Sequence, residues 1–204
     1  KPLIAYTIEQ AKKSKNISKI ILSTDDNEIM KIGKKYNIEI PFLRPKYLSS
    51  DKALAIDNYI YTIKKYSNLR KTKFENFIVL LPTSPLRTSK DIDDSIELFN
   101  KTKADSVISC KKLKSPITWI LDQKKNGRIK PIIKTNTKKM MNRQSTKLNL
   151  LPNGSIYIFN TEFLIKNYSY YGQKTYSFIM PENRSIDIDS LNDIKLLKFY
   201  MKSK

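Results

Sequence analysis

The 204-residue sequence contains no histidine, which excludes any site that needs an imidazole as base, nucleophile or metal ligand. Chemistry would have to use carboxylates, hydroxyls, lysine, arginine, tyrosine and a bound metal. A single cysteine, Cys110, allows no internal disulfide and no thiolate cluster, which is typical of a reducing compartment. No apolar run approaches about 18 residues, and no signal peptide opens the chain. We therefore expect a cytoplasmic protein.

Acidic residues are scarce: 19 Asp and Glu stand against 39 Lys and Arg, leaving a formal net charge of +20 at pH 7. Such a charge suits a nucleic acid, an anionic membrane or a polyanionic small substrate. The lysines are scattered among many Asn and Ile, however, and form no basic tract. This scatter favours a compositional bias, so we expect no nucleic-acid and no membrane partner. A polyanion-binding basic protein stays open as an alternative.

Glycine is scarce too, with four residues, while the length of 204 residues and the 40% of hydrophobic residues support one large domain, or one domain with an appendage, that can bury a core. Segments rich in branched residues alternate with amphipathic segments over much of the chain. The expected strands are 17–23, 38–43, 77–81, 105–110 and 155–159, and the expected helices are 2–11, 25–36, 53–66, 88–100 and 191–201. This alternation predicts an α/β fold with a doubly wound, mostly parallel sheet, in which 77–81 is a central strand. Ligands would bind beyond the carboxyl ends of the strands.

Residues from about 111 to 151 break this alternation. They are polar and Lys-rich, with Trp119 and Asn126-Gly127, which predicts a hairpin or an excursion from the sheet. The chain also starts at Lys1 inside a helical pattern. We therefore expect a further N-terminal piece.

The sharpest local pattern is Ser185-Ile186-Asp187-Ile188-Asp189. On a strand, residues two apart point to the same side, so Asp187 and Asp189 would converge. Converging carboxylates repel unless a cation neutralises them, and Mg²⁺ is commonly held by one or two carboxylates plus substrate phosphates. The alternative is a solvated strand end, with Asp189 capping the last helix.

Three other segments follow expected strands or precede one, and each has a structural alternative. Pro82-Thr83-Ser84-Pro85-Leu86-Arg87-Thr88 is a hydroxyl-rich loop at a ligand position, or an ordinary turn capped by Thr88. Arg44 could hold a phosphate or carbonyl by forked hydrogen bonds. The structural alternative for this segment is that Ser50-Asp51 merely caps the next helix. Asn153-Gly154 is typical of a turn before a strand.

Taken in order, these segments resemble the acylneuraminate cytidylyltransferases, the CMP-sialic acid synthetases and their relatives for other nonulosonic acids. The resemblance covers essentially the whole chain. It is carried by KPLI (1–4), STD (23–25), RP with LSSD (44–51), LLPTSPLRT (80–88), NGSIYI (153–158) and SIDID (185–189).

The resemblance implies a Rossmann-like nucleotidyltransferase fold that joins CTP to a nine-carbon α-keto acid sugar. Pyrophosphate is released, with Mg²⁺ or another divalent cation as cofactor, and the product serves bacterial cell-surface glycans. It also implies a homodimer, with residues of about 111–151 as an inserted dimerisation or lid segment.

Site residues follow from the resemblance by position. Asp187 and Asp189 correspond to the metal-binding aspartates and are the expected catalytic residues. The expected nucleotide-binding residues are Arg44, Ala53, Ala55, Thr83, Ser84 and Asn153. The expected sugar-binding residues are Leu81, Arg143, Tyr157, Tyr170 and Tyr171, with Arg143 pairing with the sugar carboxylate.

Two departures from the family pattern concern specificity. Leu81 stands where many relatives have glutamine, and Ala55 where a serine often contacts cytosine, so a different nonulosonate is expected. The family also opens with a strand and a phosphate-binding loop, so residues 1–204 are interpreted as a single domain lacking both. The alternatives are a CMP-3-deoxy-manno-octulosonate-type or other sugar nucleotidyltransferase, or a catalytically silent nucleotide-binding module.

Overall fold

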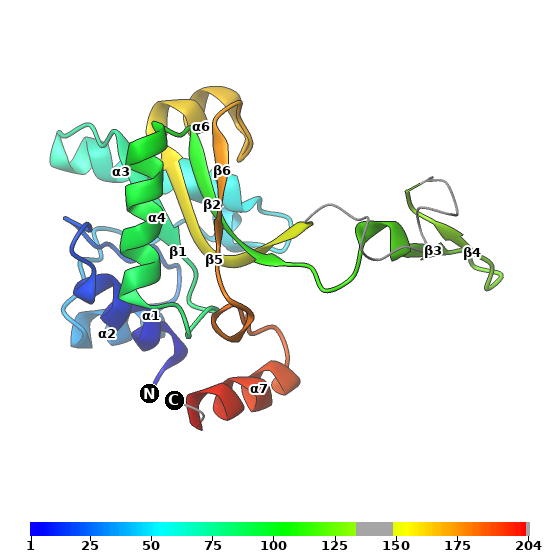
Figure 1. Cartoon of the computed structure of the whole chain (residues 1–204). Helices are drawn as coiled ribbons and strands as arrows, with labels where there is room; N and C mark the ends of the chain where they lie inside the picture. Colours follow the sequence, from blue (N-terminus) through cyan, green and yellow to red (C-terminus); the bar gives the residue numbers. More distant parts are fainter. Residues whose placement is uncertain (134–148, 203–204) are drawn as a thin grey trace.

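The computed structural model describes residues 1–133 and 149–202. A four-stranded sheet forms the centre of the main body, and a slender arm projects from it (Figure 1). The strand order is β1-β5-β2-β6, with bounds β1 (Asn76–Leu80), β2 (Ser106–Lys112), β5 (Leu150–Asn160) and β6 (Thr175–Ile179). β2 and β6 are parallel, and β5 runs antiparallel to both β1 and β2. Three strands therefore share one direction, as expected for a mostly parallel α/β sheet.

Helices cover both faces of this sheet (Figure 1). On one face, Ile92 and Phe99 pack against Ile156 and neighbouring strand residues. On the other, Ile56 and Leu164 pack against Phe159. The helices are α1 (Leu3–Lys13), α2 (Asn27–Lys35), α3 (Ala55–Arg70), α4 (Ser89–Thr102), α6 (Thr161–Asn167) and α7 (Leu191–Lys202). Successive β5 side chains serve opposite faces, so burial on both sides fixes the register of this strand.

The helices expected from the sequence are confirmed as α1, α2, α3, α4 and α7, with small changes at the ends. Thr88 and Asp91 form the capping box of α4. The N-cap of α2 is Asp26 and not Asp25, because the Asp26 carboxylate accepts the backbone N–H groups of Glu28 and Ile29. Asp25 is thereby left for an ion pair with Arg44.

The prediction of full strands at 17–23 and 38–43 was wrong. These segments pair with each other only at two isolated parallel bridges, Ile21 with Glu39 and Thr24 with Leu43. Branched residues favour an extended backbone, but a strand also needs a neighbour in register. Within the described residues, neither segment joins the four-stranded sheet.

The expected strand at 77–81 exists as β1, but it lies at one end of the described sheet order and pairs antiparallel with β5. Its apolar run reflects cover on both faces by the two helix layers. The strand expected at 155–159 extends back to Leu150, so Asn153 and Gly154 lie inside β5 and not in a turn before it. The sequence reading missed β6 and α6 altogether.

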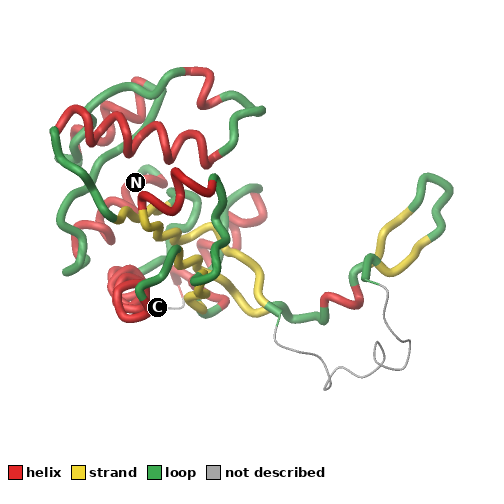
Figure 2. Tube along the Cα trace, turned by 90° about the horizontal axis from the view of Figure 1, so that it is seen from above, coloured by secondary structure: helices red, strands yellow, loops and turns green. Residues whose placement is uncertain are grey.

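Residues 113–133 leave the sheet and form the arm (Figures 1 and 2). It contains a short 3₁₀ turn, η2 (Ile117–Trp119), and a hairpin of β3 (Leu121–Gln123) and β4 (Ile129–Pro131). Gly127 turns the hairpin with φ of +79°. No described helix is long and apolar enough to cross a membrane.

Candidate active site

Four segments meet at one edge of the sheet. β1 and β2 end there, β5 begins there, and the chain that follows β6 returns to it. Two of these segments are named here: the hydroxyl loop, residues 82–88 after β1, and the aspartate segment, residues 184–189 after β6. The backbone N–H of Ile188 donates to the carbonyl of Thr83 at 2.9 Å, which joins the two. The expected site at the carboxyl ends of the strands therefore has a structural basis.

A buried amide organises the start of β5. Asn153 accepts at Oδ1 from the hydroxyl of Ser109 at 2.6 Å and donates through Nδ2 to Ser185 at 2.9 Å. Ser109 also accepts the N–H of Ile156, where the β2–β5 register shifts. These bonds fill the gap that the irregularity leaves in the ladder. The Asn153 side chain thus fastens the aspartate segment to β5.

Asp187 lies directly over Gly154. A Cβ at position 154 would come within 2.5 Å of Asp187 Oδ2, and Gly154 has φ of +70°. Glycine is therefore required here by both the backbone conformation and the approaching carboxylate. Asp187 Oδ1 is buried and has no hydrogen-bond partner among the described residues.

The prediction that 185–189 forms a strand was wrong. The segment follows a 3₁₀ turn, η4 (Glu182–Arg184), and joins no ladder in the part of the chain described. Asp187 is half-buried, whereas Asp189 is exposed. Asp189 does not cap α7 either, because Ser190 and Asp193 exchange the capping hydrogen bonds. The backbone N–H of Asp189 donates to Asp193 Oδ2 at 3.2 Å.

The hydroxyl loop is held from inside by Arg87, which is 2% exposed. Its guanidinium donates to the carbonyl of Ser155 at 2.5 Å, to Thr7 on α1 at 2.7 Å and to the carbonyl of Leu81 at 3.3 Å. Burial lowers the pKa of Arg87 to about 10, against the opposing charge of Asp91, so the group stays protonated at pH 7. Arg87 is a structural cation that ties the loop to β5 and α1.

A second arginine ties the aspartate segment to α4. Arg184 donates through Nη2 and Nε to the two carboxylate oxygens of Asp91, at 2.8 and 3.0 Å. Asp91 also accepts from the N–H and hydroxyl of Thr88. Burial tends to raise the pKa of Asp91, yet the hydrogen bonds from Arg184 and Thr88 hold it below its ordinary value.

Thr83 and Ser84 lie near the start of the hydroxyl loop. Thr83 is half-buried, and its carbonyl is taken by Ile188. Ser84 is 1% exposed, and its hydroxyl has no partner among the described residues. The structure therefore brings Thr83, Ser84, Asn153 and Asp187 to one edge of the sheet, from three separate segments of the sequence.

Arg44 is part of a local ion-pair cluster. It donates to Asp25 and to Ser49, each at 2.9 Å, and to the carbonyl of Ser23 at 3.4 Å. A hydrogen bond from Ser49, together with the charge of Arg44, lowers the pKa of Asp25. The described contacts of Arg44 thus hold residues 23–25 next to the turn η1 (Lys46–Ser49).

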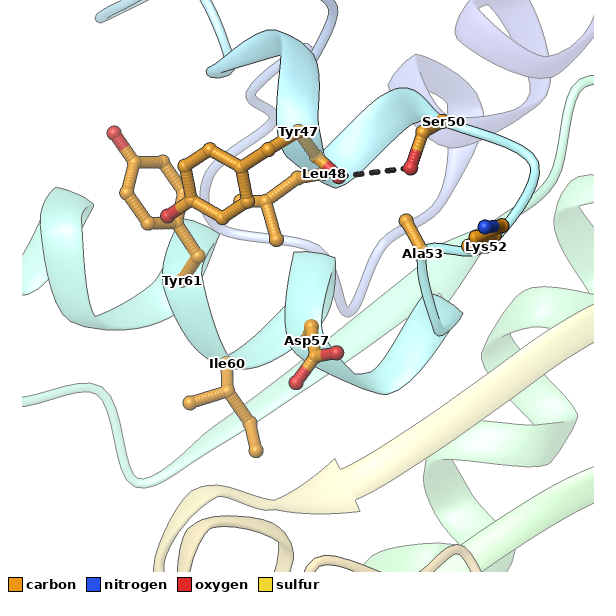
Figure 3. A pocket seen from close by; sticks show the side chains of 8 residues that line it. All are labelled: Tyr47, Leu48, Ser50, Lys52, Ala53, Asp57, Ile60 and Tyr61. Atoms are coloured by element: carbon orange, nitrogen blue, oxygen red, sulfur yellow. Dashed lines mark hydrogen bonds between the residues drawn. The ribbon is translucent and has the colours of Figure 1, made fainter.

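Ala53 lines a pocket of about 580 Å³ between η1 and the first turns of α3 (Figure 3). Asp57 and Lys52 bring charges of opposite sign to it, and Tyr47 and Tyr61 bring aromatic rings. Ala55 is exposed in the first turn of α3 and is not part of the pocket lining. The hydroxyl of Tyr168 donates to Asp57 at 2.6 Å and so fastens the end of α6 to α3.

The expected sugar-side tyrosines belong partly to an aromatic cluster on the α3 face. Tyr170 stacks on Tyr59 with ring centroids 6.0 Å apart, and Tyr157 lies 5.8 Å from Tyr170. Burial, then Tyr59 and Asp187, raise the pKa of Tyr157 to about 12, and burial raises that of Tyr170. Both hydroxyls are therefore neutral at pH 7. Tyr171 is 65% exposed.

Two further expected sugar-side residues complete the set. Leu81 is half-buried directly after β1, where its carbonyl accepts from Thr7 and Arg87. Arg143 lies outside the described residues.

Comparison with known proteins shows the family of the chain. The profile of the family described as cytidylyltransferase matches residues 1–203. The chain belongs to the cytidylyltransferase family. Among curated relatives, flagellin modification protein B of Campylobacter coli is 35% identical over 99% of this chain and 85% of its own length. CMP-N,N'-diacetyllegionaminic acid synthase of Campylobacter jejuni is 32% identical, with the same two coverages. N-acylneuraminate cytidylyltransferase of Escherichia coli is 29% identical over 96% of this chain and 45% of its own length.

Solved structures agree on the fold of this cytidylyltransferase. A CMP:2-keto-3-deoxy-manno-octonic acid synthetase complexed with CTP matches with a TM-score of 0.65 at 13% identity, covering 100% of this chain and 88% of its own. A 4-diphosphocytidyl-2C-methyl-D-erythritol synthase from Anaerococcus prevotii matches with a TM-score of 0.67 at 15% identity, covering 99% and 86%. At such identities the likeness concerns the fold alone. The Rossmann-like α/β prediction is confirmed.

The residues fit a divalent cation without forming a complete cage. Within residues 1–133 and 149–202, no three Asp, Glu or Cys side chains gather as a metal-ligand group. Mg²⁺ does not require one, since it keeps several waters and is usually bound by one or two carboxylates plus substrate phosphates. The buried Asp187 Oδ1, which lacks a hydrogen-bond donor, is an oxygen of the kind such an ion prefers.

The sequence patterns did not predict which residues hold the segments of the site together. Arg87, Asp91 and Arg184 touch several segments at once, but no local pattern shows which partner a charged side chain will find. Asp91 carried one readable signal, its place three residues after Thr88. Tyr59, which stacks on Tyr170, had no sequence signal beyond its helical spacing.

Proposed function

We propose that this cytidylyltransferase transfers the cytidylyl group of CTP to a nine-carbon α-keto acid sugar of the nonulosonic class, giving a CMP-sugar and pyrophosphate. The observation that carries the proposal is the Asp187 carboxylate, held over Gly154 beside the hydroxyl loop, with one oxygen lacking any partner. Support comes from relatives at 30–35% identity over 98–99% of the chain, two of them synthases of a CMP-nonulosonate by name.

The reaction is an in-line attack of the anomeric hydroxyl on the α-phosphorus of CTP. Such chemistry depends mainly on positioning and charge stabilisation, which a site without histidine can supply. A Mg²⁺ ion held by Asp187 and Asp189 would offset the charge of the triphosphate and lower the pKa of the attacking hydroxyl. Gly154 supports this role for Asp187, because a residue without a Cβ lets the carboxylate approach the backbone.

The binding residues are divided between the two substrates. Arg44, Ala53, Ala55, Thr83, Ser84 and Asn153 are assigned to the nucleotide, and Leu81, Arg143, Tyr157, Tyr170 and Tyr171 to the sugar. The unpartnered hydroxyl of Ser84 supports a polar ligand at the loop. The neutral hydroxyls of Tyr157 and Tyr170 are suited to hydrogen bonds with an acylamino or hydroxyl group.

The decisive assay is pyrophosphate release by the complete natural protein with CTP, Mg²⁺ and a panel of nonulosonic acids that includes an eight-carbon α-keto acid. We expect turnover with at least one nine-carbon acid. Asp187→Asn and Asp189→Ala should each lower the rate more than about tenfold, roughly 1.4 kcal/mol in barrier. Asp94→Asn, an exposed charge on α4, is the control and should retain the rate. Preference for the eight-carbon acid, or no turnover from a folded protein, would refute the assignment.

We also infer a homodimer that forms through the arm, with the reaction in the cytoplasm. Every residue of β3 and β4 is exposed, and Ile129 and Ile132 are 64% and 60% exposed. Clustered apolar side chains of this kind mark protein interaction surfaces. Cys110 is a free, buried thiol, which suits a reducing compartment.

A further inference from the structure

Besides the packing of Ile186 against Leu86 and Leu197, hydrogen bonds hold the aspartate segment at three points on three elements. Ser185 accepts from Asn153 of β5, Ile188 donates to Thr83 of the hydroxyl loop, and Arg184 grips Asp91 of α4. Asp187 lies between these anchors. The Asn153–Ser185 and Ile188–Thr83 contacts are single neutral hydrogen bonds, whereas Arg184 and Asp91 form a bidentate ion pair.

The Asp91 end of this ion pair is buried and extensively hydrogen-bonded. Its side chain is 4% exposed, and its carboxylate accepts four hydrogen bonds, two from Arg184 and two from Thr88. Buried Arg87 lies close enough for the charge of Asp91 to raise its pKa. The Asp91 carboxylate thus pairs directly with Arg184 and acts on Arg87 only through its charge.

This arrangement exceeds what capping α4 requires. The capping box needs only Thr88 and the Asp91 carboxylate, and it would be complete without Arg184. Arg184 is half-buried and comes from a 3₁₀ turn 93 residues further along the chain. Forked arginine–carboxylate pairs fix direction as well as distance, so the pair sets how the segment leaves η4.

We propose that Asp91 and Arg184 are positioning residues. They act through the aspartate segment to hold the Asp187 carboxylate in its position over Gly154. The inference rests on the proposed function, in which Asp187 is a cation ligand. Arg184 and Asp91 need touch neither substrate. Their role is to limit the positions that the Asp187 carboxylate can occupy when a metal–nucleotide complex arrives.

The test measures Mn²⁺ affinity in the presence of CTP, by electron paramagnetic resonance, in the complete natural protein. Arg184→Gln should weaken Mn²⁺ binding at least about fivefold and lower kcat more than it raises the KM for CTP. Arg184→Lys, which keeps the charge but loses the fork, should recover only part of the loss. Lys90→Gln, which breaks the exposed Lys90–Asp94 pair of α4, is the matched control and should change neither quantity.

A double variant separates positioning from general weakening of the fold. In an Asp187→Asn background, Arg184→Gln should have no further effect on Mn²⁺ affinity, because it acts through that carboxylate. Additive losses, or a fall in thermal stability with unchanged Mn²⁺ affinity, would overturn the proposal. So would an unaltered protein that binds no Mn²⁺ with CTP. If instead the Mn²⁺ pattern appears while no sugar acid supports turnover, the proposed function fails and the positioning role stands.

Discussion

Replacing Gly154 by alanine separates the two reasons for which the structure requires glycine there. The first reason is its φ of +70°, which costs an L-residue about 1–2 kcal/mol. The second is Asp187, whose Oδ2 would lie 2.5 Å from the new Cβ. Gly127→Ala is the matched control, because Gly127 has φ of +79° and nothing within 4 Å of its Cβ position.

Both the backbone strain and the crowding of Asp187 lower stability, but only the crowding should also lower activity. Alanine restricts the unfolded chain, which returns about 0.4–1 kcal/mol of stability, so the control should lose at most about 1.6 kcal/mol. Crowding adds about 1–3 kcal/mol, and the lower end applies here because the Asp187 carboxylate is a side-chain end that can rotate away. At about 2–4 °C per kcal/mol, Gly154→Ala should melt a few degrees below the control. Rotation of the Asp187 carboxylate displaces the proposed cation ligand. Pyrophosphate release should therefore fall more than about tenfold in Gly154→Ala but not in the Gly127→Ala control.

The reasoning is tested by repeating the substitution without the carboxylate. In an Asp187→Ala background, Gly154→Ala should cost only the backbone term, since the clashing oxygen is gone. Chemical denaturation of the four proteins in this cycle measures the difference. An equal cost of Gly154→Ala in both backgrounds, or full activity of the single variant, would refute the close approach.

Three further results are expected. The pKa of Asp91 is held below 3.8 mainly by Arg184 and Thr88 despite burial, so its stabilising contribution is present above that pH and lost as pH falls through the folded pKa. Arg184→Gln should therefore flatten the acid side of the stability curve, and unchanged curvature in acid denaturation would contradict this. Cys110 is 5% exposed and burial raises its pKa, so it should react with an aromatic disulfide far more slowly folded than in urea; equal rates would contradict the buried position. The unaltered protein should sediment as the proposed homodimer in analytical ultracentrifugation, and Ile132→Glu as a monomer with a nearly unchanged melting temperature; a monomeric unaltered protein or a dimeric variant would contradict the proposed arm interface.

Amphipathic helices and their caps were readable along the chain because their determinants are local. The spacing of apolar residues and the Thr88–Asp91 box specify α4 almost without tertiary help. Strands were less readable, since a ladder needs a partner. The branched segment 17–23 reaches only isolated bridges, while the less apolar Thr175–Ile179 becomes β6 because β2 lies beside it.

The sequence by itself determined the family, through ordered motifs at compatible spacing, and it named the aspartates, the hydroxyl loop and Asn153 as positions of interest. It could not determine how they meet. A strand argument paired Asp187 with Asp189, but the folded chain leaves Asp189 exposed and settles Asp187 over Gly154. Arg87, Asp91 and Arg184 gain their roles only when segments up to 93 residues apart come together. Charged side chains choose partners by distance in space, and only the packed sheet and its helices fix that distance.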